Sequence, residues 1–304
     1  MKYDTEHGYA TYPRRFDRYK WSRPIGVGIL FIIFFTAVSF ALVYFTKKYF
    51  GTTVSSTGYD DLDLFTAAGA FFNSAGIAAY IPCIALAALI VRDRPVSSYC
   101  SSMGGWRWKV FLKTLLAAFV ILGIPIIITA MINGRTGGIL FTAGGIIMLT
   151  LFGPFQGVAE EMLFRGYIMQ TVSSWFKLPI IGLTVHTVIF AAIHPYNLTG
   201  LIYISVSAVL YALVAIYSKG LEAGSALHIV NNMCELYMAG FGFGKLTGDL
   251  SFSGAAVPIV FKTLFFLFIL YADRKLHWFD EVKRDDVESF NARWNKREQK
   301  DAGR

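Results

Sequence analysis

Eight apolar runs dominate this sequence, and each is long enough to be a candidate membrane span. They cover residues 25–45, 64–91, 110–132, 139–170, 178–193, 201–217, 223–243 and 254–271. A helix needs about 20 mostly apolar residues to cross a hydrocarbon layer about 30 Å thick. Only 16% of the residues are charged, whereas soluble domains carry about a quarter. The sequence therefore predicts an all-α, polytopic membrane protein with about eight transmembrane helices, not a pair of soluble domains.

The distribution of basic residues predicts the orientation of the chain in the membrane. Six lie in residues 1–24, four or five lie between residues 92 and 113, and nine follow Asp273, whereas the loops after the first, third, fifth and seventh runs hold two, one, none and one. Cytoplasmic loops are enriched in Lys and Arg. We therefore expect an integral, multi-pass protein with both termini in the cytoplasm, in the plasma membrane if the source is bacterial. The net charge of +8 then reflects membrane orientation, and no nucleic-acid partner is expected.

This threading divides the chain into three parts. Residues 1–24 form a cytoplasmic basic N-terminus, followed by a signal anchor that is not removed. Residues 25–271 form the membrane domain, and residues 272–304 form a charged cytoplasmic tail. The tail is predicted to be a solvated helix or a loose end, with contact to anionic lipid head groups as the alternative. Three cysteines, an odd number, exclude a disulfide framework of the small secreted kind.

Ionisable residues inside apolar runs are costly and point to function. Glu161 and Arg165 are four residues apart, so on a helix they share a face and can pair. Glu160 is turned about 100° away. It is predicted to have no local partner and to project into a cavity as a general base. The alternative is a solvated Glu-Glu-Arg cluster at the membrane interface.

Two further motifs carry histidine. Phe190 and His194 end the fifth run, and His186 lies about 80° round the helix from His194 as a candidate supporting residue. In the seventh run His228 and Asn232 share a face, whereas Asn231 does not. An interfacial histidine and an interhelical hydrogen bond are the structural alternatives. Depths of roughly 15, 22 and 10 Å from the cytoplasmic ends of their runs place Glu160, His194 and His228 in one slab of the membrane.

The ordered pattern Glu-Glu-x-x-x-Arg, Phe-x-x-x-His and His-x-x-x-Asn on successive apolar helices resembles the CPBP family of intramembrane endopeptidases. This family includes the CAAX prenyl endopeptidases and the bacterial Abi proteins linked to bacteriocin processing and immunity. The resemblance covers about residues 146–243, within a core at about 139–243. The remaining runs match only in hydropathy. The motif residues are Glu160, Glu161, Arg165, Phe190, His194, His228 and Asn232.

The resemblance implies a cavity enclosed by the fourth to seventh runs and open to the cytoplasmic side. It also implies a peptide-hydrolysing site in which Glu160 and His194 activate water and His228 and Asn232 form the oxyanion hole. Glu161 and Arg165 would hold the geometry, and Phe190 would pack beside His194 as a substrate-binding residue. The expected partners are the lipid bilayer and a membrane-associated protein or peptide substrate.

Metal dependence remains open in the sequence. Glu160, His194 and His228 could make a two-His, one-carboxylate Zn²⁺ site. We favour a mechanism without a cofactor, because the His-Glu-x-x-His motif is absent and Asn232 is a poor zinc ligand but a good donor to an oxyanion.

Two charges lie outside these motifs. Glu235 and Lys262 are predicted to pair across the last two runs, with snorkelling of Lys262 as the alternative. The competing functions are a non-catalytic membrane scaffold or immunity protein of the same family, and a transporter using Glu160 and the histidines as a proton relay. The absence of a repeated pair of broken helices disfavours the transporter.

Overall fold

The computed structural model describes residues 8–51, 63–246 and 249–302, and the elements in these ranges are helical. Residues 1–7 of the predicted N-terminus, 52–62 of the loop after the first run, and 303–304 of the tail lie outside the described residues. The long helices are α1 (Arg23–Phe50), α2 (Ala67–Ala78) continued by α3 (Tyr80–Val91), α5 (Trp108–Ala118) continued by η3 (Phe119–Gly123) and α6 (Ile124–Asn133), α7 (Ala143–Glu161) continued by η4 (Met162–Met169) and α8 (Gln170–Phe176), α9 (Pro179–Ala192), α10 (Leu198–Tyr217), α11 (Glu222–Gly240) and α12 (Phe252–Leu276). The shorter or terminal ones are η1 (Tyr9–Arg15), α4 (Ser97–Cys100) and α13 (Asp286–Ala302).

A helix lies at each of the eight predicted runs, and the polytopic, all-α prediction is confirmed. Six of these helical stretches are long and apolar enough to cross a membrane: Arg23–Phe50, Ala67–Val91, Trp108–Asn133, Ala143–Phe176, Leu198–Tyr217 and Phe252–Leu276. The helix α9 has 14 residues and is about 21 Å long, shorter than the hydrocarbon layer. The helix α11 is surrounded by protein over most of its length, so its surface need not be apolar. Eight as the number of complete spans stays a prediction.

Helices that start at one end of the bundle share a capping pattern. In α2, α7, α10 and α12 a Thr, Asn or Ser side chain accepts a hydrogen bond from the backbone N–H of a glycine three residues later. This contact satisfies one of the free N–H groups at a helix start. The four pairs are Thr66–Gly69, Thr142–Gly145, Asn197–Gly200 and Ser251–Gly254.

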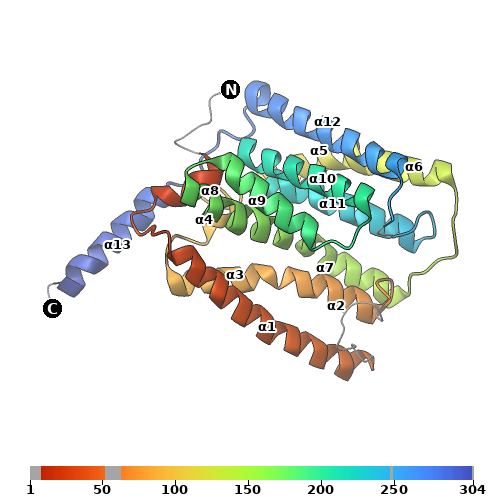
Figure 1. The fold of residues 1–304 in the computed structure, drawn as a ribbon, viewed down its shortest axis with the longest axis horizontal. Coiled ribbons are helices and arrows are strands. Elements are labelled where there is room, and N and C mark those ends of the chain that lie inside the picture. Colours follow the sequence, from red (N-terminus) through yellow and green to blue (C-terminus); the bar gives the residue numbers. More distant parts are fainter. Residues whose placement is uncertain (1–7, 52–62, 247–248, 303–304) are drawn as a thin grey trace.

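The predicted cytoplasmic segments gather at the other end of the bundle. There the hydroxyl of Tyr9 donates to the Tyr99 carbonyl, and Ser97 donates to Asp286. Figure 1 shows α13 projecting from this end. We call it the basic end, and we call the end where α2, α7, α10 and α12 begin the opposite end.

The tail contains a helix, one of the two predicted forms. The helix α13 contacts the N-terminal segment, where the Phe16 and Phe290 rings meet edge to face at 5.6 Å. The Arg18 guanidinium lies 3.4 Å from the Trp294 ring centroid. The two terminal segments therefore support each other at the basic end.

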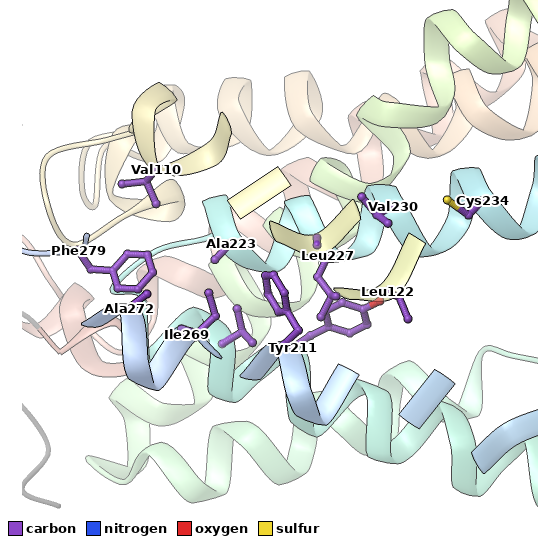
Figure 2. Packing of buried hydrophobic residues seen from close by; sticks show 13 residues of the cluster. Val110, Leu122, Tyr211, Ala223, Leu227, Val230, Cys234, Ile269, Ala272 and Phe279 are labelled. Carbon is purple, nitrogen blue, oxygen red and sulfur yellow. The ribbon is translucent and has the colours of Figure 1, made fainter. Parts of the chain in front are cut away.

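A hydrophobic core joins α5, η3, α10, α11 and α12 (Figure 2). Tyr211, Leu227 and Val230 belong to it, and Leu122 and Phe265 are fully buried in it. Burial of such apolar side chains contributes roughly 1.5–3 kcal/mol each when the reference is water. This core fixes α10 and α11 side by side, and it thereby fixes the helix that carries His228.

The approach of α7 to α11 depends on small residues. A Cβ atom at Gly157 would lie 3.1 Å from the backbone nitrogen of Ile229 and 3.0 Å from its side chain. Glycine at this position lets the two backbones come close, as in small-residue contacts between membrane helices. The close contact brings Glu160 of α7 next to His228 of α11.

Candidate active site

Two adjacent glutamates at the end of α7 begin the site. Glu161 is fully buried and Glu160 is 9% exposed. The helix changes here from α to π geometry, and η4 carries Arg165. Such π segments within α-helices occur frequently at functional sites. The sequence thus places three ionisable groups at a local irregularity of a membrane helix.

Glu161 is held by two partners. Its Oε1 accepts from Arg165 Nη1 at 2.9 Å and from His228 Nδ1 at 2.9 Å. Arg165, also fully buried, donates from Nη2 to the Ala208 carbonyl at 3.2 Å. The predicted pairing of Glu161 with Arg165 is confirmed, and mutual compensation of charge explains why both can be buried.

His228 lies between the two glutamates. Its Nε2 is 3.7 Å from Glu160 Oε2, and its ring stacks on Tyr211 with centroids 5.0 Å apart. Because a carboxylate oxygen only accepts, the contact with Glu161 fixes a proton on Nδ1. The Nε2 atom is therefore the one presented toward Glu160.

Glu160 does have a local partner, contrary to the sequence-based expectation. Gln156, one helical turn earlier, donates from Nε2 to Glu160 Oε1 at 3.3 Å. The expectation failed because it considered only charged neighbours, whereas an amide at i−4 also reaches the carboxylate. This contact orients the carboxylate and leaves Oε2 directed toward His228.

His194 follows the end of α9 and approaches the same place. Its Nδ1 lies 2.6 Å from the Phe190 carbonyl, and the two rings are 4.7 Å apart. The predicted packing of Phe190 beside His194 is confirmed. Since a carbonyl only accepts, the proton lies on Nδ1, and Nε2 of neutral His194 is free to accept one.

One cavity of about 290 Å³ brings the three motifs together. Glu160, Phe190, His194, His228 and Asn232 line it, so the predicted convergence of the motifs is confirmed. Glu161 and Arg165 are fully buried and do not line it. Further lining residues are Leu64, Asn73, Ile77, Gln156, Tyr196, Tyr203, Ile204, Ser207, Tyr211, Asn231, Glu235, Leu236, Leu246 and Lys262.

The sequence did not place several of these polar residues in the site. Asn231 lines the cavity although it was predicted to point elsewhere, and it donates to Asn232 Oδ1 at 3.2 Å. His186 is buried, with Nδ1 3.2 Å from the Gly182 carbonyl, and is not among the lining residues. The sequence could have singled out Tyr203 and Ser207 only because they are polar residues in an apolar run.

Lys262 and Glu235 meet in this cavity, but not as the predicted direct pair. Lys262 donates to the Tyr203 hydroxyl at 2.8 Å and to Ser207 Oγ at 3.1 Å. Tyr203 and Asn231 lie next to the Glu235 carboxylate. Among the described residues no Glu235–Lys262 contact reaches ion-pair distance, so Tyr203 bridges the two charges. Lys262 is 1% exposed and does not snorkel.

The cavity reaches the opposite end of the bundle. Leu64 precedes α2, Tyr196 lies between α9 and α10, and Leu246 lies between α11 and α12. The expectation that the cavity opens on the same side as the basic segments is therefore wrong. That expectation came from the family resemblance. Which loops surround the cavity depends instead on where each helix begins and ends.

The zinc alternative finds little support in the arrangement of donors. Across residues 8–51, 63–246 and 249–302, no three His, Cys, Asp or Glu side chains form a group that could hold a metal ion. Glu160 and His228 are neighbours, and all three predicted ligands line one cavity, but they do not meet as a metal-binding group.

The geometry can be compared with known families. Residues 142–234 match the family model of the type II CAAX prenyl endopeptidases, Rce1-like. The predicted CPBP resemblance is confirmed over this segment. All seven motif residues lie inside it. No curated protein and no solved structure matches the chain.

The Rce1-like segment does not supply the whole cavity. Lys262 on α12 and Asn73 on α2 both line it and both lie outside residues 142–234. The parts that resemble the family only in hydropathy therefore shape the space in which a substrate would bind.

Proposed function

We propose that this chain is a multi-pass membrane endopeptidase that hydrolyses a peptide bond in a membrane-associated protein or peptide, using Glu160 to activate water without a metal ion. The observation that carries this proposal is the convergence of Glu160, His194, His228 and Asn232 on one cavity. Burial of a carboxylate in such a cavity is costly and is typical of catalytic groups.

The first step is attack by water. A water molecule between Glu160 and His194 gives a proton to the Glu160 carboxylate while its oxygen bonds to the scissile carbonyl carbon. Glu160 then delivers that proton to the leaving nitrogen as the C–N bond breaks. The products are a carboxylic acid terminus and an amine terminus, and Glu160 returns to its carboxylate form.

The developing oxyanion needs hydrogen-bond donors that are already in position. Asn232 suits this role because its Oδ1 accepts from Asn231, which leaves its NH₂ group to donate into the cavity. His228 can donate from Nε2 when both of its nitrogens carry a proton, and Glu161 accepts from its Nδ1. Phe190 supports both His194 and Arg165, whose guanidinium lies 4.9 Å from its ring centroid.

Both termini lie in the cytoplasm in this proposal. The segments η1, α4 and the start of α13 gather at one end of the bundle, which supports this orientation. Two termini on the same side require an even number of membrane crossings. A membrane-associated protein is the substrate class that the family match supports. Maturation of a bacteriocin or other peptide remains a prediction from the Abi resemblance.

The experiment compares peptide termini in cells that express the wild type, Glu160→Gln or His228→Ala. We expect termini that appear with the wild type to be lost in both variants. The controls are Glu288→Gln and His277→Ala, which alter exposed residues of the tail. Unchanged termini in both site variants, at matched protein levels, would reject the enzyme and favour the scaffold or immunity alternative.

A further inference from the structure

The position of the cavity along the bundle indicates how a substrate reaches it. This inference rests on the proposed function. We propose that the site is entered from the extracytoplasmic side of the membrane. Its substrate is then a membrane-anchored polypeptide whose cleaved bond lies near the outer interface.

The first observation is the set of residues around the outer part of the cavity. Leu64, Tyr196 and Leu246 come from three separate connections, and all three connections lie at the opposite end. Leu246 is 43% exposed, and Leu64 and Tyr196 are half-buried. The cavity therefore extends from Glu160, midway along the α7–α8 stretch, to the surface of that end.

The second observation is that packed side chains close the path toward the basic end. Directly behind the cavity lie the fully buried Glu161 and Arg165. Beyond them, the Tyr9 hydroxyl donates to the Tyr99 carbonyl, and Gln170 bonds to Arg94. Each of these side chains is at most 3% exposed.

The same closure continues beneath α11. Glu222 receives hydrogen bonds from Arg107 Nε at 3.0 Å and Nη2 at 2.9 Å, and Arg107 also donates to the Ser218 and Phe279 carbonyls. This buried network joins α11, the start of α5 and the segment before α13. Among the residues that the structure describes, it leaves a peptide no route to Glu160 from the basic end.

The third observation is the charge difference between the two ends. At the opposite end the basic residues are Lys47, Lys48, Arg135 and Lys245. Apart from Arg165 and Lys262 inside the bundle, the other Lys and Arg among the described residues belong to segments of the basic end. Because cytoplasmic loops are the ones enriched in Lys and Arg, the opposite end is the extracytoplasmic one.

The residues beside the entrance indicate a substrate held close to lipid. Leu198 at the start of α10 and Phe252 at the start of α12 are exposed apolar side chains that flank the connections carrying Tyr196 and Leu246. Apolar residues at this level favour the membrane interface over water. A peptide bond presented there by a membrane anchor needs to travel only a short way to reach Glu160.

Single cysteines test the direction of entry without any need for activity. Leu246→Cys at the entrance and Val282→Cys at the basic end form a matched pair, since the native residues are 43% and 48% exposed. Asn73→Cys reports on the cavity itself. Each is labelled with a charged, membrane-impermeant maleimide in intact bacterial cells and again after permeabilisation.

We expect the Leu246→Cys and Asn73→Cys variants to be labelled equally before and after permeabilisation, and the Val282→Cys variant only afterwards. Labelling of Val282→Cys in intact cells, or of Asn73→Cys only after permeabilisation, overturns the inference. Loss of cleavage on Glu160→Gln tests the proposed function separately, so the two failures can be told apart.

Native cysteines set the background of this experiment. Cys83 and Cys234 are buried, and burial raises the pKa of the Cys100 thiol to about 12. Maleimide reacts with the thiolate, so Cys100 reacts slowly at neutral pH. The wild-type chain is therefore the labelling control, and removal of its cysteines is not required. A glycosylation acceptor inserted beside Leu246 gives a second readout, since it is modified only on the extracytoplasmic side of a eukaryotic membrane.

Discussion

His228 donates from Nδ1 to Oε1 of Glu161 at 2.9 Å, and the same oxygen accepts from Arg165. One carboxylate thus links η4 to α11 and fixes which nitrogen of His228 faces Glu160. His228 and Glu161 are 67 residues apart in the sequence. Glu161 is a positioning residue in this account, because it acts on the cavity only through His228 and does not line it.

Replacing Glu161 with Gln should harm both stability and cleavage. The variant leaves Arg165 buried without an opposite charge, and breaking a buried ion pair in this way costs about 3–5 kcal/mol. Thermal unfolding in detergent measures the first effect. The Glu161→Gln, Arg165→Met double variant should regain part of the stability, because no unpaired charge remains. Its cleavage should stay below that of the wild type, since a neutral amide is a weaker acceptor for His228. A single variant as stable as the wild type would contradict the network.

Gly157→Ala should separate α7 from α11. The added Cβ would lie 3.1 Å from the backbone nitrogen of Ile229, and backbone cannot move aside as a flexible side chain can. We expect a loss of about 1–3 kcal/mol, as for other overpacked sites, together with reduced cleavage because Glu160 moves away from His228. Gly138→Ala is the matched control, since a Cβ there meets nothing within 4 Å. Equal effects of the two substitutions would show that the close approach is unimportant.

Removal of metal ions should leave cleavage intact. Glu160, His194 and His228 do not form a group suited to a metal ion, and the proposed water activation needs only a carboxylate base. The measurement is peptide cleavage by purified protein before and after treatment with a chelator, alongside metal analysis. Zinc at one equivalent per chain, with activity lost on chelation and regained on adding zinc, would replace the metal-free mechanism with the zinc alternative.

Lys262 and Glu235 should prove energetically coupled through Tyr203. Lys262→Met removes the cation that faces Glu235 and leaves that carboxylate without an opposite charge. Glu235→Gln in the same chain should restore part of the lost stability, with a coupling of about 0.5–3 kcal/mol. Unfolding midpoints of the two single variants and the double variant provide the cycle. Strictly additive effects would mean that the two charges act independently.

Local spacing was enough to predict parts of the site. The interval between Glu161 and Arg165 fixes a shared helix face, and the ordered motifs with similar depths led to the convergence of Glu160, His194 and His228. These inferences succeed because they depend on the rise and turn of single helices.

Other features depend on how helices lie beside one another, which spacing alone does not determine. Tyr203 of α10 bridges Lys262 of α12 to Glu235 of α11, and no local pattern connects those helices. The basic residues predicted which segments share an end of the bundle. They carried no information on which end the cavity reaches, because that depends on the packing around Arg165 and on the connection that carries Leu246.

The central claim is that the Glu160 carboxylate activates the water. Cleavage of a substrate identified from wild-type cells should be measured with purified wild type and Glu160→Gln at equal unfolding temperature. The account predicts a loss of about 100-fold or more, because a positioned general base contributes roughly 10²–10⁴-fold. Cleavage by Glu160→Gln at the wild-type rate would contradict it.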